Sequence, residues 1–101
     1  MKLIVRHEAD EEFHLACARM EAELPGLGAR FGDEVRRFLR QVAADPERER
    51  VRRLQGQEYR RVNLKSFPHF IAYIIDRETV FVFAISHGHR KPGHWLGRLE
   101  P

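Results

Sequence analysis

The residues best suited to chemistry gather after the last apolar run of the chain. His87, Arg90 and Trp95 follow that run, together with three more polar side chains, His89, Lys91 and His94. An imidazole can act as a general acid or base near neutral pH, and an arginine can bind a phosphate or carboxylate through two parallel hydrogen bonds. A tryptophan can stack on a base or anchor a protein interface. This segment therefore predicts either a binding site for an anionic partner or a small acid–base site.

A second group of cations lies earlier in the chain. Residues 47–65 contain seven basic residues, among them Arg60 and Arg61, against three acidic ones, whereas residues 7–24 contain six acids against Arg19. The formal net charge is only +3, so the charge is unevenly spread rather than large. Such a chain can present opposite fields on different surfaces. The basic surface suits nucleic acid or an acidic protein.

Each candidate also has a purely structural explanation. Trp95 could be a core residue that pins the C-terminal segment to a sheet. Arg60 and Arg61 are neighbours on a predicted strand, so they must point to opposite faces, and at least one could be a structural ion-pair partner. His87 could be a buried histidine that is hydrogen-bonded to the backbone. The residue types alone leave both explanations open.

The elements that position these residues begin with a short strand over residues 2–6 and an amphipathic helix. Apolar residues recur at steps of three and four through this helix: Ala9, Phe13, Ala16 or Cys17, Met20 and Leu24. Pro25 and two glycines end it within residues 23–28. A second stripe marks another helix that ends before Asp45-Pro46: Phe31, Val35, Phe38, Leu39 and Val42. Helices joined by so short a turn are expected to pack as an antiparallel hairpin.

The rest of the chain has strand character. Residues 60–65, 69–76 and 79–87 are predicted strands, and the turn at residues 76–79 makes a hairpin of the last two. We therefore predict an α+β fold with the helix pair on one face of a small sheet. The 79–87 run is apolar on both faces up to Ser86, which is typical of a central strand covered on both sides. Its end is where side chains can emerge into solvent.

The bulk composition fits one domain over residues 1–101. The chain has 101 residues, of which 43% are hydrophobic and 33% charged. The single cysteine, Cys17, cannot form an intramolecular disulfide, and no spacing of His, Cys or carboxylates suggests a metal site. No apolar run approaches the roughly 20 residues of a membrane span. We therefore expect a cytoplasmic protein with no membrane association, cofactor or metal.

Several short motifs occur together and in order. They are LPGLGARFGDEV at the helix turn, RRVNLKSFPHFIAYIID in the strand region, and VFVFAISHGHRKPGHW at the end. In these motifs the chain resembles the RelE/ParE superfamily of type II toxin–antitoxin toxins, most closely its ParE-like branch. The matching residues are Arg60, Arg61, Phe67, Pro68, Tyr73, His87, Arg90, Pro92 and Trp95. The resemblance implies an N-terminal strand, an antiparallel helix hairpin on a mainly antiparallel sheet, and a cognate antitoxin as partner.

The resemblance also implies one of two activities. ParE-like members typically inhibit DNA gyrase without hydrolytic chemistry, whereas RelE-like members cut messenger RNA in the ribosome, often with a tyrosine near the C-terminus. This chain has only Tyr59 and Tyr73, and His94 occupies the aromatic position expected before Trp95, so the chain departs from both typical patterns. Gyrase inhibition is our leading prediction, with the target-binding residues Arg60, Arg61, His87, Arg90, Trp95 and Arg98. The alternative is a ribosome-dependent endonuclease that uses His87, Arg61 and Arg90, so whether the protein is an enzyme stays open.

Overall fold

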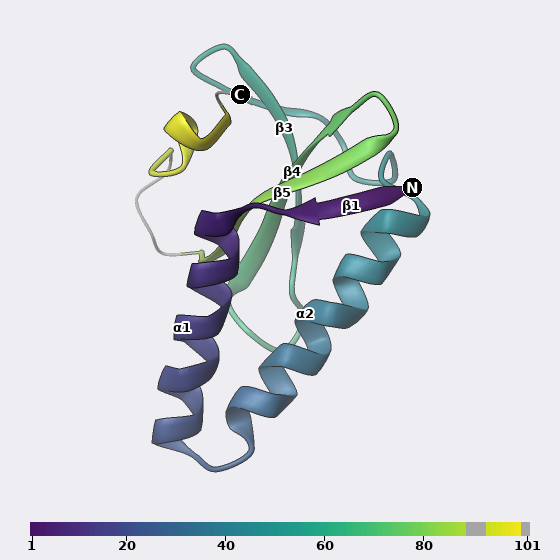
Figure 1. Cartoon of the computed structure of the whole chain (residues 1–101). Helices are drawn as coiled ribbons and strands as arrows, with labels where there is room; N and C mark the ends of the chain where they lie inside the picture. Colours follow the sequence, from purple (N-terminus) through teal and green to yellow (C-terminus); the bar gives the residue numbers. More distant parts are fainter. Residues whose placement is uncertain (89–92, 100–101) are drawn as a thin grey trace.

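The computed structural model of the chain describes residues 1–88 and 93–99. In these residues a first strand is followed by two helices, four more strands and a short 3-10 helix (Figure 1). The bounds are β1 Lys2–Val5, α1 His7–Glu23, α2 Leu27–Ala44, β2 Arg52–Leu54, β3 Gln57–Asn63, β4 His69–Asp76, β5 Thr79–His87 and η1 Leu96–Leu99. No helix in this part of the chain is long and apolar enough to cross a membrane.

The helix hairpin forms as expected, and the turn between α1 and α2 shows why. Gly26 has a φ of 90°, in the left-handed region that glycine tolerates best. At Gly28 the helices approach so closely that an added Cβ would lie 2.5 Å from the carbonyl oxygen of Cys17. The Glu21 carboxylate accepts hydrogen bonds from the backbone N–H groups of Gly26 and Gly28, which satisfies donors at the start of α2. The two helices therefore run antiparallel, as Figure 1 shows.

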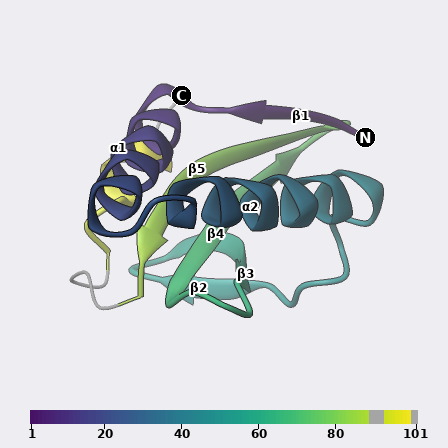
Figure 2. The same cartoon turned by 90° about the horizontal axis from the view of Figure 1, so that it is seen from below.

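The five strands form one sheet in the order β1-β5-β4-β3-β2 (Figure 2). β1 pairs with β5 in parallel, and the other pairings are antiparallel. The predicted α+β fold with a mainly antiparallel sheet is confirmed. β5 is an inner strand as far as Val82, where β1 stops pairing with it. Beyond Val82, β5 is the edge of the sheet.

Separate apolar clusters cover the two sides of the sheet. On the side that we call the helix face, α1 and α2 pack over the main core, whose buried residues are Ala9, Phe31, Val35, Val42, Leu64, Ile71, Tyr73, Val80, Val82 and Ile85. On the opposite side, the open face, the C-terminal segment packs onto a smaller set. This open-face cluster consists of Phe70, Ala72, Phe83, Ala84 and Trp95, with the partly buried Leu54, Tyr59, Ile74, Leu96 and Leu99 at its border.

The β2–β3 hairpin was not predicted from the sequence. β3 begins at Gln57, three residues before the predicted strand, and β2 precedes it across a two-residue turn. Both turn residues have positive φ, 50° at Gln55 and 79° at Gly56, which suits the twist of a tight hairpin. Arg52, at the start of β2, is thereby placed opposite Tyr59. Within the basic residues 47–65, Arg52–Leu54 therefore forms the edge strand β2 of the sheet.

A β-bulge decides on which face the end of β5 lies. Ala72 pairs with Ala84 but Tyr73 pairs with Val82, so Phe83 is an extra residue on β5. As a result Phe83 and Ala84 both belong to the open-face cluster, and Ile85 returns to the helix face. His87, two residues beyond Ile85, lies on the helix face as well. Strict alternation from Phe83 would have placed His87 on the open face.

Candidate target-binding site

Arg60 and Arg61 lie on opposite faces of the sheet, as expected for neighbours on a strand. Arg60 pairs with Tyr73 on the helix face. Its Nη1 donates hydrogen bonds to the carbonyl oxygens of Glu47, at 3.2 Å, and Glu49, at 2.6 Å. These bonds tie the segment after α2 to β3. Arg60 is therefore engaged within the fold, through backbone carbonyls.

Arg61 lies on the open face and is partly exposed. Its guanidinium carbon is 4.1 Å from the centroid of the Phe70 ring, and its Nε donates to Oδ1 of Asn63 at 3.0 Å. Stacking on an aromatic face leaves the edge of a planar guanidinium available for other acceptors. Burial lowers the pKa of Arg61, and the neighbouring Arg52 charge lowers it further. The side chain is thus held in place without being neutralised.

Trp95 is almost entirely buried, with 4% of its surface exposed. Its ring lies 4.5 Å from that of Tyr59 and 5.0 Å from that of Phe83, measured between centroids. Trp95 and Phe70, on which Arg61 stacks, belong to the same cluster, so Arg61 and Trp95 come together on the open face. Because its indole is covered, Trp95 contributes by fixing the C-terminal segment rather than by offering a stacking surface.

Arg98 is bound to Glu12 of α1 in a nearly buried ion pair. Its Nη1 lies 2.8 Å from Glu12 Oε1 and also donates to the carbonyl oxygen of Phe83 at 3.2 Å. Glu12 Oε1 accepts the Ile85 N–H at 3.1 Å. Both contacts with β5 fall beyond Val82, where β1 no longer supplies partners. Glu12 and Arg98 therefore complete the hydrogen bonding of the open edge of β5 and fasten the C-terminal segment to it.

Glu12, Ser86, His94 and Arg98 form one polar group, which we call the Glu12 cluster. Ser86 Oγ donates to Glu12 Oε2 at 2.6 Å, and His94 Nε2 lies 3.2 Å from Ser86 Oγ and 3.4 Å from Glu12 Oε2. In a catalytic triad the base uses one ring nitrogen for the nucleophile and the other for the carboxylate. Here both contacts involve Nε2, so the cluster lacks the geometry of an activated serine.

The charge of Glu12 is stabilised by its partners despite its burial. Burial alone raises the pKa of a carboxyl group, but hydrogen bonds from Arg98, Ser86 and the Ile85 backbone outweigh it and hold the pKa of Glu12 below its usual value. The carboxylate is therefore ionised at neutral pH. The sequence does not single out Glu12, which is one of the six acids in residues 7–24. Its position, three residues after Ala9 and four before Ala16, on the border of the buried stripe, was the available signal.

His87 lies beside a second histidine on the helix face. The ring centroids of His87 and His69 are 5.1 Å apart, and a cavity of about 150 Å³ that they line also contacts Arg19 of α1. His69 is 8% exposed, and burial together with the His87 charge lowers its pKa to about 4. Its Nδ1 is buried without a hydrogen-bond partner among the described residues. His69 was not predicted as a site residue, because it is the first residue of the apolar strand β4.

The other predicted site residue, Arg90, lies outside the described residues. The structure therefore brings Arg61 together with Trp95, places Arg60 and His87 on the helix face, and engages Arg98 with Glu12. Within residues 1–88 and 93–99 no group of three or more His, Cys, Asp or Glu side chains is suited to hold a metal ion.

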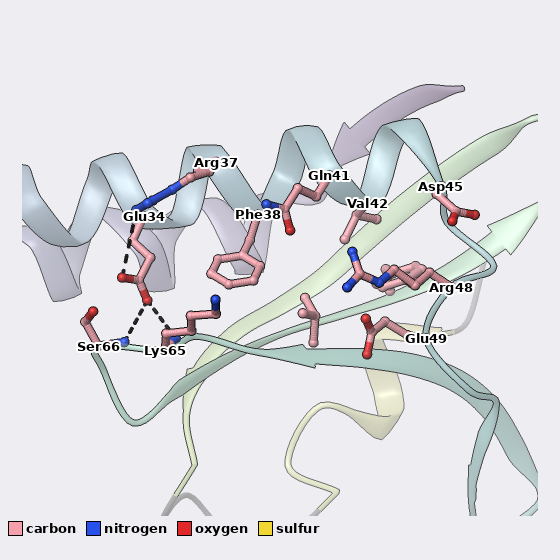
Figure 3. Close-up of a pocket in the computed structure, with 12 residues that line it drawn as sticks. Glu34, Arg37, Phe38, Gln41, Val42, Asp45, Arg48, Glu49, Lys65 and Ser66 are labelled. Carbon is pink, nitrogen blue, oxygen red and sulfur yellow. Dashed lines mark hydrogen bonds and ion pairs between the residues drawn. The ribbon is translucent and has the colours of Figure 1, made fainter.

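A cavity of about 360 Å³ lies between α2 and the chain on either side of β3 (Figure 3). At one end the Glu34 carboxylate accepts the backbone N–H groups of Lys65 and Ser66, at 2.8 and 2.9 Å. Burial raises the pKa of Glu34, but these bonds outweigh it and leave the pKa below its usual value. Figure 3 shows acidic and basic side chains alternating around the rim: Glu34, Arg37, Asp45, Arg48, Glu49 and Lys65. This groove has no excess of either charge.

Comparison with solved structures first defines the class of fold. The protein in "Chromosomal ParDE TA system from P. aeruginosa" is similar to this chain with a TM-score of 0.73, over 86% of this chain and 95% of that one. The two sequences are only 12% identical, so this similarity concerns the fold.

The sequence itself then gives the family. Residues 4–92 match the ParE toxin of the type II toxin–antitoxin system, parDE. The chain belongs to this family of toxins, and its membership implies a cognate antitoxin as partner. No curated protein matches the chain in sequence.

Proposed function

We propose that this toxin arrests growth by inhibiting DNA gyrase and that it contacts its target through the open face of the sheet. Arg61 is the direct contact on this face, with Arg90, from the segment that follows β5, as its predicted companion. Trp95 and Arg98 act by holding the C-terminal segment in place, and Arg60 acts by fixing β3. His87 is left out of the contact, because it lies on the helix face.

The observation that carries this proposal is the separation of His87 from Arg61. Cleavage of RNA needs a general base or acid and a cation at the same phosphate. His87 pairs with His69 on the helix face, whereas Arg61 pairs with Ala72 on the open face. The sheet stands between the imidazole and the guanidinium. A binding function needs no such convergence.

Tyr73 offers no substitute for a catalytic tyrosine. Its ring is fully buried, and its hydroxyl donates to the carbonyl oxygen of Pro46 at 2.7 Å. Burial and the nearby Glu49 charge raise the pKa of Tyr73 to about 12. The hydroxyl is thus occupied and hard to ionise. This supports a function that does not depend on acid–base chemistry.

The experiment compares both activities with the same purified protein. We expect wild-type toxin to inhibit supercoiling by DNA gyrase and to leave ribosome-bound messenger RNA intact. Arg61→Gln should weaken the inhibition about tenfold, a loss typical of one charge-assisted hydrogen bond. His87→Gln is the matched control on the other face and should inhibit like wild type. Cleavage of the message that depends on His87, with unchanged supercoiling, would overturn the proposal in favour of the endonuclease.

A further inference from the structure

Two arginines lie together on the open face at the edge of the sheet. Arg52 of β2 pairs with Tyr59 of β3, and Arg61 is two residues further along β3 on the same face. The Arg52 charge is close enough to lower the pKa of Arg61. Phe70 beneath Arg61 and Asn63 beside it restrict the orientation of that guanidinium. We call Arg52 and Arg61 the arginine pair.

The arginine pair has no anionic partner within the described part of the chain. No carboxylate of residues 1–88 or 93–99 forms an ion pair with either guanidinium, and the buried Nε of Arg52 has no acceptor there. Nearby arginines differ: Arg53 binds Glu58, and Arg98 binds Glu12. Two like charges held close together without an anion repel each other, which is unfavourable. An anion between them would remove that repulsion and supply the missing acceptor.

The surroundings favour a single acidic side chain over a nucleic acid. Trp95 and Phe83 are buried, so these rings cannot stack with bases. The cavity of about 590 Å³ that borders Tyr59 is lined by two acidic residues, Glu58 and Asp76, and two basic ones, Arg6 and Arg60, so it offers no excess of positive charge to a continuing row of phosphates. A protein surface presents one carboxylate among apolar groups, which suits an arginine pair next to partly buried Leu54 and Tyr59.

We propose that Arg52 and Arg61 together bind an acidic side chain of the protein that the toxin inhibits. The identity of that protein as DNA gyrase rests on the function proposed above. A carboxylate has two oxygens in one plane and accepts hydrogen bonds from two guanidinium groups at once. Arg52 thereby becomes a contact residue, which the sequence analysis did not include. Asn63 and Phe70 are positioning residues for Arg61.

The first measurement uses a probe that does not depend on gyrase. A terminally blocked peptide of glutamates is titrated into the purified toxin, and the side-chain N–H signals of arginine are followed by NMR. The signals of Arg52 and Arg61 should shift, and Arg52→Gln and Arg61→Gln should each weaken binding about tenfold. Arg53→Gln, one residue away but paired with Glu58, is the control and should bind like wild type. Unshifted arginine signals, or equal binding by all three variants, would refute the anion site.

The second measurement identifies the source of the carboxylate. The same variants are tested for binding to purified gyrase and to a short DNA duplex at one salt concentration. Loss of gyrase binding in Arg52→Gln, but not in Arg53→Gln, supports the proposal. Tighter binding to the duplex than to the peptide through the same two arginines overturns it in favour of phosphate. If the peptide binds at the arginine pair but wild-type toxin does not bind gyrase, the proposed gyrase function is wrong and the carboxylate site is still supported.

Discussion

The Glu12 cluster and the arginine pair use the same side-chain chemistry in opposite ways. In the Glu12 cluster the Arg98 guanidinium is nearly buried and meets a carboxylate at 2.8 Å. In the arginine pair the two side chains share one face of the sheet, the charge of Arg52 lowers the pKa of Arg61, and neither guanidinium pairs with a carboxylate of the described residues. The Glu12 cluster completes the hydrogen bonding of the β5 edge, whereas the arginine pair leaves its positive charge available to bind an anionic group of a partner. The role of an arginine in this protein therefore follows from the face and the edge of the sheet that it occupies.

The largest effect is expected when the Glu12 cluster is broken. Glu12→Ala leaves the Arg98 charge nearly buried without its partner and removes an acceptor from the β5 edge. Removing one member of such a pair costs about 3 kcal/mol of the free energy of unfolding. Denaturant unfolding followed by circular dichroism measures the change. Glu11→Ala, on the exposed side of the same helix, is the control and should cost under about 0.5 kcal/mol.

Buried His69 should make the stability of the protein depend on pH, unlike the exposed histidines of α1. The pKa of His69 falls from its ordinary 6.5 to about 4 on folding, so the unfolded chain binds more protons between these values. Stability should therefore fall as the pH drops through this window, by about 1–2 kcal/mol after allowance for partial solvation. Unfolding midpoints at about pH 7 and about pH 5 measure it.

The His69→Gln variant distinguishes the contribution of His69 to this pH dependence from that of the carboxyl groups. His69→Gln should flatten the slope in this window, whereas His14→Gln, at an exposed position on α1, should leave it unchanged. Glu12 and Glu34 have lowered pKa values, so their contribution is lost only at still lower pH. A slope that survives His69→Gln would contradict the assignment to this ring.

The sequence was sufficient to predict the helix hairpin and the last two strands. Apolar spacing located both helices, and residues 69–76 and 79–87 match β4 and β5 as observed. It was insufficient for the β2–β3 hairpin, since Arg52–Leu54 is short and charged and Gln55-Gly56 is a weak turn signal. An edge strand of three residues has too few side chains to show a periodicity.

The candidate site was predictable in part, and two tertiary features account for the rest. The division of Arg60 and Arg61 between faces follows from the strand period and was predicted. The bulge at Phe83, which turns His87 to the helix face, has no signature in a run of apolar residues. The partner of Arg98 is Glu12 of α1, which is far away in sequence, so no local sequence pattern predicts this ion pair. Arg52 lies near Arg61 only because the β2–β3 hairpin, which was not predicted, pairs it with Tyr59.

A smaller effect should distinguish the two neighbouring arginines of β3. Arg60→Ala removes hydrogen bonds to the carbonyl oxygens of Glu47 and Glu49 and should cost about 1 kcal/mol of unfolding free energy. Arg61→Gln should cost less, because it removes mainly a cation–π contact with Phe70 at a partly exposed position, yet it should reduce growth inhibition on induction. Thermal melts paired with colony counts after induction measure both. If toxicity were lost only in Arg60→Ala, the helix face rather than the open face would have to contact the target.

The smallest effect is expected at Arg53, next to a member of the arginine pair but in a different setting. Its guanidinium pairs with Glu58, and the two side chains are 74% and 54% exposed. Exposed pairs of this kind contribute under about 1 kcal/mol, and often nothing measurable. Arg53→Gln should therefore leave the melting temperature, growth inhibition and peptide binding unchanged. If it matched Arg52→Gln in any binding assay, net charge alone would explain the arginine pair, and its geometry would be irrelevant.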